Sequence, residues 1–314
     1  MILPAAARVV KRRDTIKRMA VYVGTAGFQY KDWEGTVYPK ELKKQKIHPL
    51  EFLAQYLDCC EINTSFYGHI QPQHGKNWCR FAASANPNFQ FTAKMNRAFT
   101  HSPAAAVQST SAETIRPLPE DEKLARAGLD SIVEENRLGA LLAQFPISFK
   151  NTEENHQYLS SLIKKFNSYP LAVELRHASW NDPSIYSELR AEKVGFVNLD
   201  QPRLGRALEG TAHVTAPIGY VRLHGRNYNQ WFEAEKCEDR YNYLYKPQEL
   251  EKWKDKIEVI SQKTEKTFVI TNNHPKGKAV ANALELRSML SGLKVKAPKT
   301  ILQQYWEVAD FALP

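Results

Sequence analysis

The chain has 314 residues, 43% of them apolar, and a formal net charge of +9. It holds no apolar run of the roughly 18 residues that a membrane-spanning helix needs, so the sequence predicts no membrane segment. Of its four cysteines, Cys59 and Cys60 are adjacent on a predicted strand and point to opposite faces, so they cannot pair with each other. We therefore expect no disulfide framework and a cytoplasmic location.

Basic residues concentrate at the start of the chain. Residues 1–20 contain six bases against one acid, which is +5 of the net charge and leaves +4 for the rest. We expect a disordered basic leader at 1–20 and a single folded domain at 21–314. A basic arm for nucleic acid, a transit-like segment and a non-native upstream start are the alternatives for the leader.

Eight short apolar runs follow one another along the chain. They cover residues 21–28, 59–67, 89–95, 138–146, 171–177, 195–200, 219–226 and 267–274. Most are separated by stretches long enough for a crossover helix, which is typical of parallel strands.

Helix signals occur in three of those stretches. Residues 49–56 begin with a proline, Asn181-Asp182-Pro183 precedes a run to Arg190, and residues 248–260 have helical spacing. Eight such units predict one (β/α)8 TIM barrel. The alternative, a doubly wound open sheet, is less favoured because no GxGxxG turn follows the first run.

Ordered motifs at the run ends resemble a known family. They are GTAGFQYKDW (24–33), YP (38–39), EINTSFY (61–67), FTAKMNRAFTH (91–101), LLAQFPISF (141–149), VELRHASW (173–180), the Asp200–Pro202 step, YVRLHGR (220–226) and NNHPKGKAVANALEL (272–286). Together they are similar to the domain-of-unknown-function family 72, the YecE-like proteins, over residues 21 to about 290. The resemblance implies a TIM barrel distantly similar to the endonuclease IV and sugar isomerase barrels. It implies no activity.

Polar residues recur on one side of each predicted strand. Alternation groups them as Glu61, Asn63 and Ser65; Thr92 and Lys94; Glu174 and Arg176; Asn198 and Asp200; Arg222, His224 and Arg226. We expect all five groups to face the barrel interior, where an unpaired charge costs several kcal/mol. The charges must then be neutralised by one another, by a ligand or by a metal. A purely structural ionic core without turnover is one alternative.

The residue types favour an enzyme for a phosphorylated or otherwise anionic small substrate, a hydrolase, lyase or isomerase, acting at the carboxyl ends of the strands. The predicted catalytic residues are Glu174, His224, Asp200 and Glu61. The predicted substrate-binding residues are Lys94, Arg176, Arg222, Arg226, Asn63, Tyr67, Asn273, His274 and Trp180. We expect Arg222, His224, Arg226 and Asn273 to converge into one anion pocket, with Gly225 opening the backbone to the anion.

Two alternatives to this hypothesis stay open. No cofactor is predicted, but a divalent metal could use Glu61, Glu174, Asp200, His224 and His274, although Arg176 and Arg222 would compete for the carboxylates. The second alternative is a nucleic-acid-binding barrel of the repair-endonuclease type, which would use the leader and aromatic loops.

Overall fold

The structure, a computed structural model, describes residues 20–102, 110–202, 210–228 and 237–314. Nearly all of the predicted basic leader lies outside the described residues, and its state stays a prediction. Ala20 already belongs to the first strand.

Eight parallel strands form a closed barrel in chain order. Their bounds are β1 (Ala20–Ala26), β2 (Cys59–Ile62), β3 (Gln90–Lys94), β4 (Leu138–Gln144), β5 (Leu171–Glu174), β6 (Gly195–Asp200), β7 (Ile218–Leu223) and β8 (Lys266–Thr271). The barrel closes where β1 pairs with β8, with Gly24 opposite Ile270. The predicted TIM barrel is confirmed, and the open sheet is excluded because both edges of the sheet are paired.

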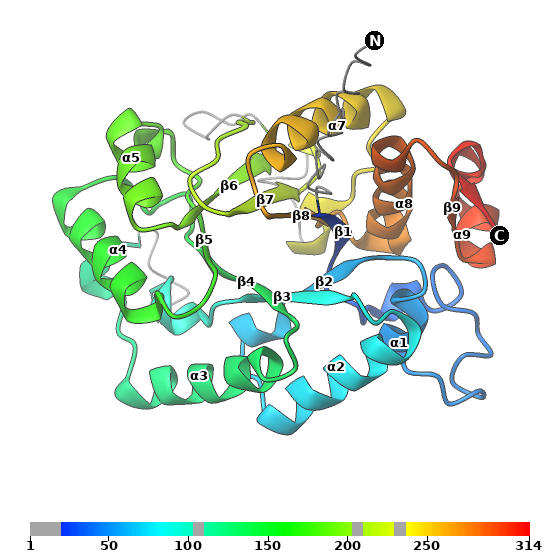
Figure 1. The fold of residues 1–314 in the computed structure, drawn as a ribbon, viewed down its shortest axis with the longest axis horizontal. Coiled ribbons are helices and arrows are strands. Elements are labelled where there is room, and N and C mark those ends of the chain that lie inside the picture. The colour runs from blue at the N-terminus through cyan, green and yellow to red at the C-terminus, as the bar shows by residue number, and fades with distance from the viewer. Residues whose placement is uncertain (1–19, 103–109, 203–209, 229–236) are drawn as a thin grey trace, which may run out of the picture.

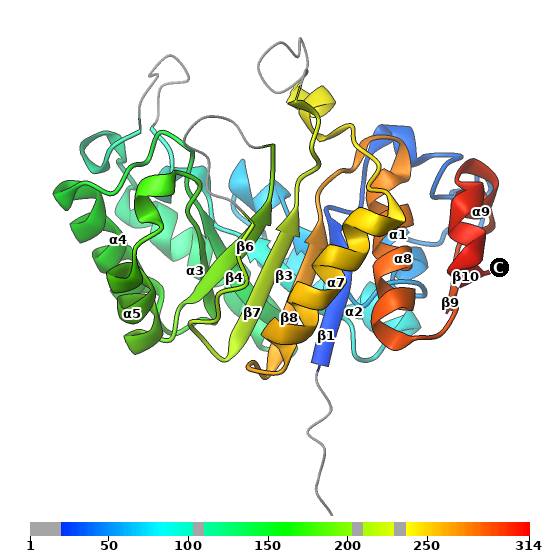
Figure 2. The same cartoon turned by 90° about the horizontal axis from the view of Figure 1, so that it is seen from above.

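Helices surround the strands (Figures 1 and 2). They are α1 (Pro49–Leu53), α2 (Pro72–Ala85), α3 (Pro119–Val133), α4 (Glu153–Phe166), α5 (Pro183–Ala191), α7 (Pro247–Ser261), α8 (Lys278–Ser291) and α9 (Lys299–Gln304). The two short strands β9 (Val295–Lys296) and β10 (Ala312–Leu313) pair beside α8 and α9 at the C-terminal edge (Figure 1). No helix in the described part of the chain is long and apolar enough to cross a membrane.

Short 3-10 helices shape several loops. They are η1 (Lys31–Trp33), η2 (Thr64–Phe66), η3 (Arg97–Phe99), η4 (Ala112–Thr114), η5 (Ala178–Trp180), η6 (Cys237–Tyr241), η7 (Pro275–Gly277) and η8 (Trp306–Asp310). Two of them matter for the site. η2 follows β2 and carries Phe66, and η7 follows β8 next to His274.

The helix ends follow local sequence signals. The Asp182 carboxylate accepts a hydrogen bond from the Ser184 backbone at 2.8 Å, and Pro183 occupies the first turn of α5, as the predicted cap requires. α8 is capped after Ser291 by Gly292, which has a φ of +69° that glycine adopts without strain. The predicted helices at 49–56 and 248–260 correspond to α1 and α7.

The apolar core has two parts. Side chains of the barrel interior include Ala140, Leu142, Val197, Leu199 and Ile270, and a larger cluster fills the layer between strands and helices. Cys59 belongs to the inner part and Cys60 to the outer part, which confirms that the two cysteines point to opposite faces. Apolar residues thus fill the barrel interior toward the amino ends of the strands, and polar groups occupy it at the carboxyl ends.

Candidate functional site

A buried arginine bridges two carboxylates inside the barrel. Arg222 on β7 is 1% exposed and donates to Glu61 on β2 at 2.6 Å and to Glu174 on β5 at 2.5 Å. Glu61 and Glu174 are both fully buried. Because an isolated charge is costly in this interior, the opposite charges of the three side chains compensate one another.

Further polar groups join Arg222, Glu61 and Glu174 in what we call the charge cluster. Arg176, just beyond the end of β5, donates through Nε to Glu174 at 2.6 Å. The Nε2 atom of His224 lies 3.5 Å from the same carboxylate, and its Nδ1 lies 2.9 Å from the Asn272 amide nitrogen. The Gln144 carbonyl oxygen accepts from Arg222 at 3.2 Å. Residues on or just beyond β2, β4, β5, β7 and β8 therefore meet in one network at the carboxyl ends of the strands.

The protonation states follow from burial and charge. Burial alone would raise the pKa of Glu174, but Arg222 and Arg176 together hold it well below its usual range. Burial lowers the pKa of His224 to about 3, although Glu174 opposes the shift. At neutral pH Glu174 is therefore an anion and His224 a neutral imidazole, so neither group gains or loses a proton readily.

Lys94 differs from the other charged groups in the interior. It is the last residue of β3, and its ammonium nitrogen lies 3.8 Å from the centre of the Phe66 ring. Within the described residues it forms no ion pair with a carboxylate. Burial lowers its pKa to about 7, Arg222 acts in the same direction, and Glu174 and Glu61 oppose them. Lys94 is therefore the group of this cluster that changes its charge near neutral pH.

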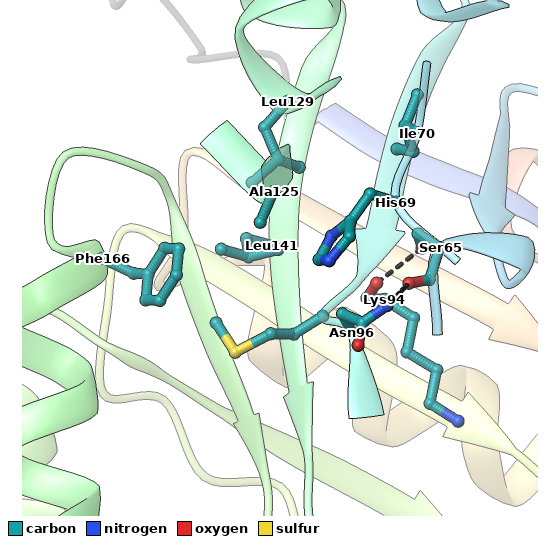
Figure 3. Close-up of a pocket in the computed structure, with 10 residues that line it drawn as sticks. Ser65, His69, Ile70, Lys94, Asn96, Ala125, Leu129, Leu141 and Phe166 are labelled. Carbon is teal, nitrogen blue, oxygen red and sulfur yellow. Dashed lines mark hydrogen bonds between the residues drawn. The ribbon is translucent and has the colours of Figure 1, made fainter. Parts of the chain in front are cut away.

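The backbone around Lys94 is held firmly. The Ser65 hydroxyl donates to the Lys94 carbonyl oxygen at 2.5 Å, and the Asn96 amide donates to the Ser65 carbonyl at 3.1 Å. These contacts border a small cavity, lined also by His69, Leu141 and Phe166 (Figure 3). The Lys94 side chain extends away from Leu141 and Phe166 in that view. Strand alternation thus sends it toward the barrel interior.

A pocket of about 520 Å³, the mouth pocket, opens at the carboxyl ends of the strands. It is lined by Gly27, Phe28, Gln29, Tyr30, Asn63, Thr64, Tyr67, Trp78, Lys94, Gln144, Arg222, Tyr241, Asn272 and His274. His274 stacks on Tyr30 with ring centres 4.2 Å apart, and Tyr67 is 78% exposed. Lys94 and Arg222 connect this pocket to the charge cluster, so a bound molecule would meet both cations.

Two polar atoms near this pocket lack a partner. Within the described chain, the Arg222 Nε and the Asn63 Oδ1 are buried and form no hydrogen bond. Both residues belong to the pocket lining. Since buried polar groups are nearly always satisfied, these atoms indicate a place for a polar ligand or for water.

Comparison with known proteins shows the family of this chain. The model of the family described as "Protein of unknown function DUF72" matches residues 22–304. The chain belongs to the DUF72 family. The UPF0759 protein YunF of Bacillus subtilis (strain 168) is 28% identical over 283 residues, which are 86% of this chain and 94% of that protein.

Crystal structures of two DUF72 proteins share the fold. One, from Thermotoga maritima MSB8, is 35% identical, has a TM-score of 0.74, and is matched over 87% of this chain and 99% of its own. Another, from Enterococcus faecalis V583, is 26% identical with a TM-score of 0.70, over 86% and 95% of the two chains. The match confirms the family resemblance seen in the motifs, and it assigns no substrate to the site.

Most of the predicted site residues of this DUF72 barrel come together. Glu61, Glu174, Arg176, Arg222 and His224 form the charge cluster. The mouth pocket takes in Asn63, Tyr67, Lys94 and His274 from the predicted binding residues, together with Arg222. The roles of these residues stay predictions, but their proximity is a feature of the fold.

One predicted stripe faces the wrong way. We expected Asn198 and Asp200 to point into the barrel, but their neighbours Val197 and Leu199 fill the interior. Asn198 instead accepts from Thr211 at 2.7 Å and from the His213 backbone at 2.8 Å. It therefore fixes the loop after β6 on the outer side of the strand.

Arg226 is likewise separated from Arg222. β7 ends at Leu223, and Gly225 then adopts a φ of +91°, which stops the alternation on which the prediction depended. Arg226 binds Asp200 through Nε and Nη2 at 2.9–3.1 Å, and Glu249 of α7 through Nη1 at 2.9 Å. With two acids already bound, it does not belong to the mouth pocket.

Two other predicted binding residues have structural contacts. Asn273 donates to the Tyr243 carbonyl and to the Asn282 side chain, both at 2.8 Å. Trp180 is fully buried and donates to the Phe149 carbonyl at 2.8 Å. The predicted convergence of Arg222, His224, Arg226 and Asn273 is therefore wrong.

The predicted site residues did not include Asn272, although its segment was expected at the end of the eighth strand, nor Gln144; both contact the cluster. Asn272 would have been found by extending the inward face of β8 by one alternation, because Phe268 and Ile270 point inward. Gln144 lies at the end of β4, where an amide in an otherwise apolar run was the available signal.

The side chains proposed as metal ligands do not form one set of metal ligands. Arg222 binds both Glu61 and Glu174, while Asp200 points outward and binds Arg226. Across the described ranges, no group of three or more His, Cys, Asp or Glu side chains is placed to hold a metal ion. The donor set thus does not fit a divalent cation, and we derive no step through one.

Proposed function

We propose that this protein is an enzyme that binds a small anionic substrate in the mouth pocket. One observation carries the proposal: the two carboxylates of the cluster are already paired with Arg222 and Arg176, and Lys94 adds a third cationic group at the pocket wall. When Lys94 is protonated, the cluster carries one uncompensated positive charge. A carboxylate or phosphate in the pocket would balance it.

The position and shape of the pocket support the same proposal. Active sites of TIM barrels lie at the carboxyl ends of the strands, where this pocket opens. Its volume suits a small molecule. Tyr30 and His274 supply stacked rings on one wall. The Arg222 Nε and the Asn63 Oδ1, which have no partner among the described residues, supply a donor and an acceptor. Glu174 keeps Arg176 and Arg222 in place and stays ionised while it does so.

Thermal unfolding with added anions tests this function. Inorganic phosphate, sugar phosphates and nucleotides are compared with uncharged sugars at one ionic strength. A ligand at a hundredfold excess over its dissociation constant stabilises a protein by about 2.7 kcal/mol. We expect stabilisation by anions and its loss in Lys94→Met, with Lys263→Met as the matched control because Lys263 is exposed.

The same assay separates the nucleic-acid alternative. Short duplex and single-stranded DNA are added in parallel, each at low and at moderate salt. Stabilisation by DNA alone, lost steeply with salt, would favour nucleic-acid binding over the small-molecule site. No response to any anion would contradict the proposed function.

A further inference from the structure

We propose that Lys94 forms a covalent imine with the carbonyl group of an anionic aldehyde or ketone bound in the mouth pocket. The inference rests on the proposed function and names a substrate class for it. It starts from the position of Lys94, whose side chain lines the mouth pocket. Figure 3 shows that its backbone carbonyl is held by the Ser65 hydroxyl. A nucleophilic side chain needs a fixed backbone position and an open path by which the substrate can reach it.

The surroundings of Lys94 favour a neutral amine. Its nitrogen faces the Phe66 ring at 3.8 Å, and no carboxylate of the described residues lies within ion-pairing distance. A ring face attracts an ammonium more weakly than a carboxylate does. Glu61 and Glu174 are nearby, but Arg222 and Arg176 already bind them. The lone pair of Lys94 is therefore available at neutral pH.

The remaining titratable neighbour does not change this balance. His101 also contacts Phe66, in an edge-to-face arrangement with ring centres 4.9 Å apart. Burial lowers the pKa of His101 to about 4, and the charge of Lys94 acts in the same direction. The imidazole is thus neutral and adds no counter-charge. A pKa near 7 for Lys94 agrees with this arrangement, in which two arginines surround the amine and no unpaired acid of the described residues does.

Arg222 favours an anionic partner even when Lys94 is neutral. Once the amine is neutral, the pocket still presents Arg222, whose Nε has no partner in the described chain. A carboxylate or phosphate held there would place an attached carbonyl beside Lys94, since both residues line the same pocket. Aldehydes and ketones that carry an acidic group meet both requirements.

The chemistry balances without any further reactant. The Nζ lone pair attacks the carbonyl carbon, a C–N bond forms, and the C=O π electrons pass to the oxygen, which takes the proton that nitrogen releases. The carbinolamine then loses its hydroxyl with the second N–H proton as water, which leaves a C=N bond. A protonated imine withdraws electrons from the adjacent carbon, so bonds to that carbon break more readily. Isomerases and lyases use this effect.

Reductive trapping tests the imine on the full-length protein. Glyoxylate and pyruvate serve as anionic carbonyl probes, acetone as a neutral carbonyl and lactate as an anion without a carbonyl, each with sodium cyanoborohydride at pH 7. Peptide mass spectrometry then locates the secondary amine. At this pH an amine of pKa 7 has roughly a thousandfold larger unprotonated fraction than an ordinary lysine of pKa about 10.4.

We expect the Lys94 peptide to be modified by glyoxylate or pyruvate at least about tenfold faster than the peptide of exposed Lys263, with acetone slower and lactate inert. The rate should rise with pH through about 7. Adduct at this peptide should vanish in Lys94→Gln and Lys94→Arg and persist in Lys263→Met. Two variants are used so that a folding defect in one, seen by circular dichroism, does not decide the result.

Three outcomes would overturn the imine. Labelling of Lys94 no faster than Lys263, or a rate that rises only near pH 10, would show an ordinary lysine. No adduct while lactate or phosphate still stabilises the protein would leave the anion site standing and remove the imine. No adduct together with no stabilisation by any anion would remove the proposed function as well.

Discussion

Arg222 and Glu61 are 161 positions apart in the chain and form an ion pair of 2.6 Å across the barrel interior. They come from β7 and β2, which are not neighbours in the sheet. The pair therefore joins opposite parts of the barrel wall, and Glu174 on β5 adds a third point of attachment. These three side chains therefore contribute both to the candidate site and to the stability of the barrel.

Removing one member of this cluster should destabilise the fold. Glu174→Gln would leave Arg222 and Arg176 with one carboxylate between them, and breaking a buried ion pair costs about 3–5 kcal/mol. Urea unfolding measures this loss, with the exposed Glu192→Gln as the control. A loss below about 1 kcal/mol would show that water or rearrangement compensates for the missing charge.

Lys94 should give the stability a pH dependence of known sign. Its pKa is about 7 in the folded protein and about 10.4 in an unfolded chain, so the unfolded chain binds more protons between these values. The free energy of unfolding should therefore rise with pH from about 7 to about 10 through this group. Lys94→Met removes the term and should stabilise the protein more at pH 6 than at pH 9.5, by at least about 2 °C in melting temperature. An equal effect at both pH values would contradict the lowered pKa.

Arg226 should matter for stability and not for anion binding. Arg226→Ala breaks contacts with Asp200 and Glu249, and hydrogen bonds to charged groups are worth about 1.5–3 kcal/mol each when buried, less here because the arginine side chain is 30% exposed. Phosphate should stabilise this variant as it does the wild type. Arg190→Ala, a change at an exposed arginine, is the control. Loss of the phosphate response would place Arg226 in the site after all.

The turn after β7 should tolerate only glycine. A Cβ at Gly225, whose φ is +91°, would lie 2.8 Å from the Tyr243 Cβ. Gly225→Ala should cost about 1–3 kcal/mol from the strained backbone, and more from the clash. Gly292→Ala separates the two causes, because Gly292 has a φ of +69° and open space around its Cβ position. Equal losses in the two variants would show that Tyr243 moves aside freely.

The sequence by itself determined the repeated order of strand and helix in this protein and the polar residues at the strand ends. Eight apolar runs with crossover lengths between them predicted the barrel, because parallel strands need such connections. The sequence also predicted that one barrel interior holds Glu61, Glu174, Arg222 and His224, because the carboxyl ends of all barrel strands lie at the same end of the barrel. These predictions need only the order of elements and the alternation of side chains along a strand.

Only the tertiary structure decided which face of each strand looks inward and which charges pair. Alternation groups Asn198 with Asp200, but the packing of Val197 and Leu199 into the interior turns that pair outward. The turn at Gly225 takes Arg226 to Asp200, and Lys94 keeps no acid partner in the described chain because Arg222 and Arg176 engage both nearby carboxylates. Such outcomes depend on register and on competition among neighbours brought together by folding, and neither is encoded in the local pattern of one strand.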